Sequence, residues 1–266
     1  MRGMWRAMVL ALAGGLLAMV PAGPAWAPRE CGHCGPAVLG MWDGSYQGVG
    51  NPTDRGSLAL EVTSQQGRRF GGTLTGLGGP DTIPVEGTVA RSGQLSLVGR
   101  DQGEHVVVQG EVVDPDQGGI GNPDIFEGRF ALTGPGGKTE GDLVLVHATG
   151  FPGEALAGLW EGTARFIGNP DTRELALELA RDGTGRGMLD EAGFVIGWAV
   201  GEPAPDGTAA FAGVGGAEVG IIVVDGKYTP PDLREGAPAT IEGDIRLLPA
   251  DGGPDQEGTF IVVVGG

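Results

Sequence analysis

The stretch LGMWDGS, from Leu39 to Ser45, decides the fold, because it returns as AGLWEGT from Ala157 to Thr163. Matched residues lie 118 positions apart there and 115 apart at FEGRF and IEGDI. The chain therefore contains one unit of sequence twice. The other segments that recur in the same order are GNP at 50–52 and 168–170, LALEV at 58–62 and LALEL at 175–179, FEGRF at 126–130 and IEGDI at 241–245, and EGDL at 140–143 and EGTF at 257–260.

Apolar and polar residues alternate along nearly every segment of this unit, which is typical of strands with one buried face. Phe126, Phe130 and Leu132, for example, share a face opposite Glu127 and Arg129. Gly, Pro, Asn and Asp stand between these segments and indicate tight turns. In the first copy the pattern predicts strands near residues 40–49, 57–64, 69–76, 83–90, 94–99, 104–113, 125–132 and 139–148.

Eight short strands in each copy predict an all-β protein of two tandem eight-stranded antiparallel up-and-down barrels. A closed barrel is favoured because closure removes the exposed edges of a sheet. A flattened β-sandwich is the alternative for each copy. No segment carries a long helical pattern.

The N-terminal segment has the pattern of a signal peptide. Arg2 and Arg6 precede an uncharged apolar run at residues 9–20, and Ala25-Trp26-Ala27 fits a small-residue cleavage site. The predicted product is secreted or periplasmic, with no membrane span after the signal is removed. The expected divisions are a signal peptide at 1–27, a Cys-containing segment at 28–37, the first barrel repeat at 38–150, a linker at 151–156 and the second barrel repeat at 157–266.

The charge balance excludes some classes of partner. The chain carries 34 acidic and 17 basic residues and a formal net charge of −17. This charge repels nucleic acids and anionic membrane surfaces. A transmembrane barrel is disfavoured because only two tyrosines are available for the aromatic girdles of such barrels.

The Gly-x-Trp motifs Gly40-Met41-Trp42 and Gly158-Leu159-Trp160 resemble the first strand of the calycin superfamily, the lipocalin-like and avidin-like barrels. The segment Phe70 to Leu74 resembles the third strand of avidin-type barrels. This resemblance implies a barrel that encloses a small apolar ligand. Avidins hold biotin with an Asn two residues after the Trp, and here that position is Gly44 or Gly162. Biotin is therefore not the expected ligand.

Within such barrels the large inward residues are the candidates for ligand contact: Trp42, Tyr46, Trp160 and Phe166. The other interpretation is that the tryptophans fill the core. The sequence shows neither a nucleophile elbow nor a phosphate-binding loop, so we predict no enzymatic activity and no cofactor.

Gly-Asn-Pro occurs three times and supplies a second set of candidates, Asn51, Asn122 and Asn169. Asn-Pro initiates turns, so these segments can be loops with duplicated geometry. They can also contact a ligand at the rim of a barrel. Asp124 and Asp171 follow two of the motifs and offer the oxygen ligands that Ca²⁺ prefers.

Cys31-Gly32-His33-Cys34 is similar to the active-site motif of protein disulfide isomerases. It lacks the thioredoxin-like context that this chemistry requires, and it has too few ligands for a structural zinc site. We predict a disulfide between Cys31 and Cys34 in an exposed loop, with a redox role or metal binding as alternatives.

Two hypotheses for the function follow. The first is an exported soluble binding module that encloses a small apolar ligand in one or both barrels. The second is a structural or protein-interaction protein of the cell envelope, with filled barrels, whose partner is another envelope protein. The volume of the barrel interiors distinguishes the two hypotheses.

Overall fold

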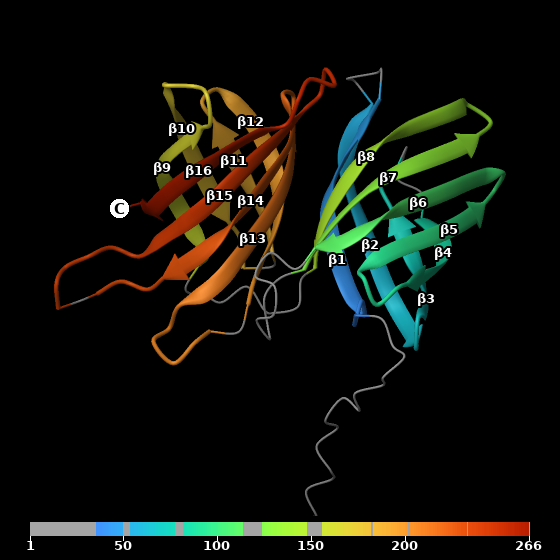
Figure 1. Ribbon diagram of the computed structural model, residues 1–266, viewed down its shortest axis with the longest axis horizontal. Helices are drawn as coiled ribbons and strands as arrows, with labels where there is room; N and C mark the ends of the chain where they lie inside the picture. The colour runs from blue at the N-terminus through green and yellow to red at the C-terminus, as the bar shows by residue number, and fades with distance from the viewer. Residues whose placement is uncertain are drawn as a thin grey trace, which may run out of the picture. The chain divides into compact units, whose positions relative to one another are not determined.

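The computed structural model describes residues 36–49, 54–77, 82–113, 124–147, 156–181, 183–201, 203–232 and 234–265. These residues form sixteen β-strands and no helix (Figure 1). The strands make two closed barrels, one from β1 to β8 and one from β9 to β16. The predicted all-β class and the two eight-stranded barrels are confirmed, and the alternative of flattened sandwiches is not what the chain forms.

The first barrel is an up-and-down meander in which each strand pairs antiparallel with the next. It closes where β1 pairs with β8, and Gly44 lies opposite Leu145 in that pair. Its strands are β1 (Gly40–Gly48), β2 (Arg55–Gln66), β3 (Arg69–Thr75), β4 (Thr82–Val89), β5 (Gln94–Asp101), β6 (Glu104–Val113), β7 (Ile125–Gly134) and β8 (Gly137–His147).

The second barrel repeats this topology and closes where β16 pairs with β9. Gly162 lies opposite Val262 in the closing pair, at the position equivalent to Gly44. Its strands are β9 (Gly158–Phe166), β10 (Thr172–Leu179), β11 (Thr184–Leu189), β12 (Ala192–Val200), β13 (Ala209–Ala217), β14 (Gly220–Thr229), β15 (Thr240–Pro249) and β16 (Gln256–Val264).

Each barrel has its own apolar core, which follows from the period-two alternation of its strands. The inward side chains of each barrel form one contiguous cluster. The largest of them are fully buried tryptophans and phenylalanines, among them Trp42 and Phe126 in the first barrel and Trp160, Trp198 and Phe211 in the second. These bulky side chains occupy the space that barrel closure encloses.

Inward glycines let the closing strands approach each other. A Cβ atom at Gly44 would lie less than 3.0 Å from the carbonyl oxygen of Val144, and one at Gly162 would meet that of Ile261 in the same way. Both obstacles are backbone atoms, which cannot rotate aside. These positions therefore require glycine where the first and last strands of each barrel meet.

A third apolar cluster lies outside both cores, within the single compact unit His33–Gly266. It joins outward residues of β7 and β8 to outward residues of β12, β13 and β14. An ion pair between Arg246 and Glu127 accompanies it. The buried members are Ile125, Val144, Val146, Ala199, Ala212, Val214, Ile221 and Val223. Part of the outer surface of the second barrel is thus used for packing within the chain.

Candidate functional site

The two tryptophans of the Gly-x-Trp motifs are core residues, and each makes the equivalent hydrogen bond in its own barrel. Both side chains are 1% exposed. Trp42 Nε1 donates to the carbonyl oxygen of Val38 at 3.0 Å, and Trp160 Nε1 donates to that of Leu156 at 2.8 Å. Each bond therefore ties the segment before the first strand to the barrel interior. It also gives a partner to the indole nitrogen, the only polar atom of the side chain.

The other two inward candidates also pack in the cores. Tyr46 meets Phe130 edge to face, with ring centroids 5.6 Å apart. Phe166 lies beneath the guanidinium of Arg173, whose carbon is 5.6 Å from the ring centroid. The same guanidinium donates to Asp190, and this hydrogen bond is the main cause of the lowered pKa of that carboxyl.

The loop candidates are only partly described. Asn51, Asn122, Cys31 and Cys34 lie outside the described residues, as do the expected signal peptide and most of the expected linker. Asn169 is exposed, and its side-chain oxygen accepts the backbone N–H of Asp171 at 3.0 Å. This bond closes an Asx turn, the structural role that Asn-Pro segments commonly have. Among the described residues, no group of three or more His, Cys, Asp or Glu side chains could hold a metal ion.

Asp124, the remaining loop candidate, faces a buried histidine that sequence reasoning had not assigned a role. His147 is 4% exposed and stacks on Trp42, with ring centroids 4.3 Å apart. Its Nε2 bonds the carbonyl oxygen of Leu39 at 2.8 Å, and its Nδ1 lies 3.7 Å from an Asp124 oxygen. The second barrel has Val264 opposite its tryptophan, where the first has His147. The histidine thus belongs to one barrel only.

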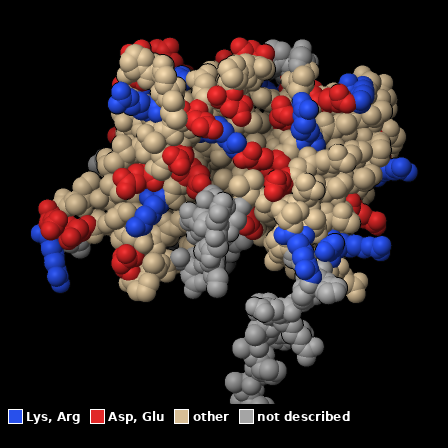
Figure 2. Space-filling view, viewed as in Figure 1, with Lys and Arg blue, Asp and Glu red and all other residues tan. Residues whose placement is uncertain are grey.

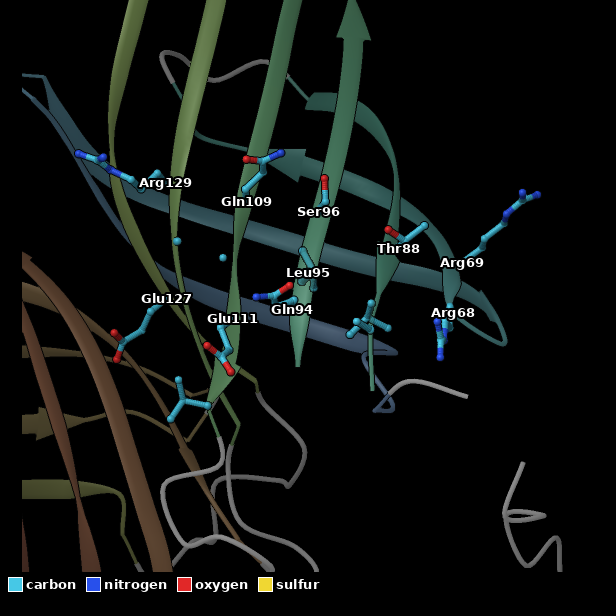
Figure 3. A pocket seen from close by; sticks show the side chains of 15 residues that line it. Arg68, Arg69, Thr88, Gln94, Leu95, Ser96, Gln109, Glu111, Glu127 and Arg129 are labelled. Carbon is cyan, nitrogen blue, oxygen red and sulfur yellow. The ribbon is translucent and has the colours of Figure 1, made fainter. Parts of the chain in front are cut away.

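A groove with a volume of about 1040 Å³ lies on the outside of the first barrel (Figure 3). It crosses strands β3 to β7, and outward side chains supply most of its polar groups. The residues that line it are Arg68, Arg69, Thr88, Val89, Ala90, Gln94, Leu95, Ser96, Gln109, Gly110, Glu111, Val113, Glu127, Gly128 and Arg129. The groove is the candidate functional site of the protein.

Strand register places five of these residues in one row across the sheet. Arg69 lies opposite Thr88, Thr88 opposite Ser96, Ser96 opposite Gln109, and Gln109 opposite Arg129. Directly opposite residues on one face of a sheet hold their side chains about 5 Å apart. Figure 3 shows this row from Arg129 at one end to Arg69 at the other. The groove therefore offers one hydrogen-bonding side chain from each of five successive strands.

Most of these polar side chains have no partner among the residues that the structure describes. In the part of the chain that the structure describes, nothing bonds the side chains of Arg68, Arg69, Thr88, Ser96 or Gln109. Arg129 differs, because its Nε donates to Asp142 at 3.1 Å. A row of exposed donors and acceptors with free bonding capacity can bind a polar ligand without first breaking internal bonds.

The corresponding row of the second barrel has a different character. On β12 to β15 it contains Ala199, Ala212, Asp225 and Asp244, in the places of Thr88, Ser96, Gln109 and Arg129. Asp244 occupies the place of Arg129, as the alignment of IEGDI with FEGRF requires. Ala199 and Ala212 are buried in the apolar cluster outside the cores. The groove is therefore a property of the first barrel alone.

Sequence reasoning missed the groove because it treated outward polar residues as solvated. The signal lay in the difference between the two copies, since Ser96 and Gln109 correspond to Ala212 and Asp225. Such a difference marks the surfaces that the copies no longer share. The difference between the copies does not reveal that five strands align these residues in one row.

Comparison with known proteins identifies no family. No family model matches the chain, and no curated protein matches it. Among solved structures, the chain is similar to a protein of unknown function from the DUF3598 family of Nostoc punctiforme PCC 73102. The two are 15% identical, the match covers 86% of this chain and 96% of that chain, and the TM-score is 0.25. In the described residues no helix has the length and apolar character needed to cross a membrane.

Proposed function

We propose that this protein is a non-enzymatic binding module that holds an extended polar ligand in the groove on the outside of its first barrel. One observation carries the proposal: most side chains of the row Arg69, Thr88, Ser96, Gln109 and Arg129 lack partners in the described part of the chain. The groove has a volume of about 1040 Å³, which is enough to hold a ligand of several residues. A surface with many free donors and acceptors selects ligands by hydrogen bonding.

The occupied interiors support a site outside the barrels. Trp42, Phe126 and Leu145 are each no more than 2% exposed within the first barrel, and Trp160 and Phe211 are equally buried in the second. Eight strands leave an interior that side chains can fill. The proposal therefore places the ligand on the surface of a filled barrel and not inside it.

We also propose that the protein is exported and that it is distantly related to the calycins. The N-terminal pattern at residues 1–27 supports secretion or a periplasmic location. The closed eight-stranded meander and the Gly-x-Trp motif on the first strand of each barrel support the relation. Figure 2 shows acidic side chains spread over the visible face, with basic side chains between them. Such a charged surface suits a soluble exported protein.

A bulky residue at the centre of the row is expected to abolish binding. Ser96 points outward from β5, so Ser96→Tyr fills the groove without entering the core. The measurement is binding to printed arrays of neutral glycans, acidic glycans and polar peptides. Wild type should retain at least one probe that Ser96→Tyr no longer binds.

The matched control is Met188→Tyr, which adds the same ring at an exposed position on β11 of the second barrel. It should bind as the wild type does, and both variants should show the thermal unfolding of the wild type. Binding that persists in Ser96→Tyr, or the absence of any bound probe, would contradict the proposed function.

A further inference from the structure

We infer that the ligand of the groove is an oligosaccharide that carries one anionic group, held at the end of the groove where Arg68 and Arg69 lie. This inference rests on the proposed function and adds the chemical class of the ligand. It follows from the distribution of charge along the groove, from the absence of aromatic side chains among its described lining residues and from the closure of the barrel.

The two ends of the groove differ in charge, because one holds Arg68 and Arg69 and the other holds Arg129 together with two acidic side chains. Figure 3 shows Arg68 and Arg69 together at one end, with Glu111 and Glu127 toward the other. Glu111 lies directly opposite Glu127 in the β6–β7 pair. Glu127 is neutralised by Arg246, whereas Glu111 has no partner among the described residues. Among the described residues, the groove thus has a basic end with two unpaired guanidinium groups and an end where Arg129, which is bonded to Asp142, lies near one unpaired carboxylate.

The space between these ends is lined by hydroxyl and amide groups. Thr88, Ser96 and Gln109 form the middle of the row, and Gln94 lies beside Glu111 in the β5–β6 pair. These side chains both donate and accept hydrogen bonds. A chain of sugar hydroxyls has the same dual capacity along its whole length, so it can bond every strand that it crosses.

A peptide fits this surface poorly. An extended peptide usually binds by adding a strand to an open sheet edge, and a closed barrel has no such edge. A helical peptide requires an apolar groove for its apolar face. Of the described residues in the lining, Val113 is the one large apolar side chain that is substantially exposed, at 40%. The hydrogen-bonding row is therefore better matched by a saccharide.

Nucleic acid is also a poor match. Its affinity comes from several phosphate contacts, and single strands add stacking on aromatic rings. Among the described residues that line the groove, two guanidinium groups have no partner and no side chain is aromatic. The chain as a whole carries a net charge of −17. One anionic group on an otherwise neutral ligand fits two free arginines beside an acidic region.

The difference in charge between the two ends of the groove determines which end of the ligand lies at which end. The anionic group accepts charge-assisted bonds from Arg68 and Arg69, which are stronger than neutral hydrogen bonds. Hydroxyls at the other end donate to Glu111, whose carboxylate only accepts. A second anionic group there would face Glu111 and weaken binding. The site therefore prefers one terminal charge over a charge on every sugar.

The test compares a tetrasaccharide that ends in glucuronate with the same tetrasaccharide ending in glucose, by isothermal titration calorimetry on the full exported chain. We expect the glucuronate form to bind about tenfold more tightly, since hydrogen bonds to a charged group are stronger than those between neutral groups. Salt should reduce that difference, because exposed charges are screened.

Two variants assign the preference to its residues. The double variant Arg68→Gln and Arg69→Gln should remove the advantage of the glucuronate form and leave weak, equal binding of both sugars. Arg186→Gln changes an exposed arginine on β11, outside the groove, and should leave the preference intact.

The outcomes separate the inference from the proposed function. Equal binding of the two tetrasaccharides that Ser96→Tyr abolishes overturns the inference and leaves the proposed function standing. A glucuronate preference that survives in the double variant also overturns the inference. No binding of either sugar overturns it as well, and the array experiment with Ser96→Tyr then decides the proposed function separately.

Discussion

Replacing Trp160 by alanine is expected to lower the free energy of unfolding by about 3–5 kcal/mol, the range for truncating a large buried aromatic side chain. Trp160 is 1% exposed, and its ring meets Tyr228 edge to face, with centroids 6.1 Å apart. Its Nε1 bond to Leu156 holds the segment before β9 against the core. The substitution removes this bond and leaves a cavity in the second barrel.

Urea denaturation followed by far-ultraviolet circular dichroism measures the effect without depending on tryptophan fluorescence. Met188→Ala, at a position 49% exposed on β11, is the control and should change stability by less than about 0.5 kcal/mol. The stability of Trp160→Phe should lie between those of Trp160→Ala and Met188→Ala, because Phe keeps a ring and loses the hydrogen bond. If Trp160→Ala were as stable as the control, the indole would not be a core element.

Adding one methyl group at Gly44 is the second prediction with a large effect. The new Cβ would lie less than 3.0 Å from the carbonyl carbon and oxygen of Val144 and from Cα of Leu145. All three are backbone atoms of β8, the strand that closes the barrel on β1. Gly44→Ala must therefore push these strands apart, and we expect a loss of about 3 kcal/mol, the upper end for overpacking in a core.

The control for this prediction is Gly136→Ala, because a Cβ there would meet no heavy atom within 4 Å. Its thermal unfolding should match that of the wild type. Gly162→Ala, the equivalent change in the second barrel, should destabilise as Gly44→Ala does, since its Cβ would meet the backbone of Ile261. Wild-type stability of Gly44→Ala would mean that β1 and β8 are not closely paired there.

The strands were predictable because their signal is local. The predicted segments at 69–76, 104–113 and 125–132 correspond to β3 (Arg69–Thr75), β6 (Glu104–Val113) and β7 (Ile125–Gly134). Alternation with period two follows from the pleat of one strand and needs no information about its neighbours. The repeat then fixed the number of barrels, because two similar units fold alike.

The candidate site was not predictable in the same way. Outward residues of a strand look alike in sequence whether they meet solvent, a ligand or another part of the chain. Ala212 and Val214 are outward residues of β13 that became buried, whereas Ser96 at the place of Ala212 lies in the groove. Likewise, nothing in the local sequence indicated that His147 would stack on Trp42.

The sequence by itself determined the duplicated unit, its eight strands and the inward positions of its large apolar residues, since these depend on spacing along the chain. Only the tertiary structure decided which outward residues stand together. Arg69 and Arg129 are far apart in the chain, and they end one row because the register of four successive strand pairs aligns them. The register of each pair follows from its hydrophobic pattern and from the turn that joins its two strands. The row exists only where four such registers combine, and no single segment of sequence contains that combination.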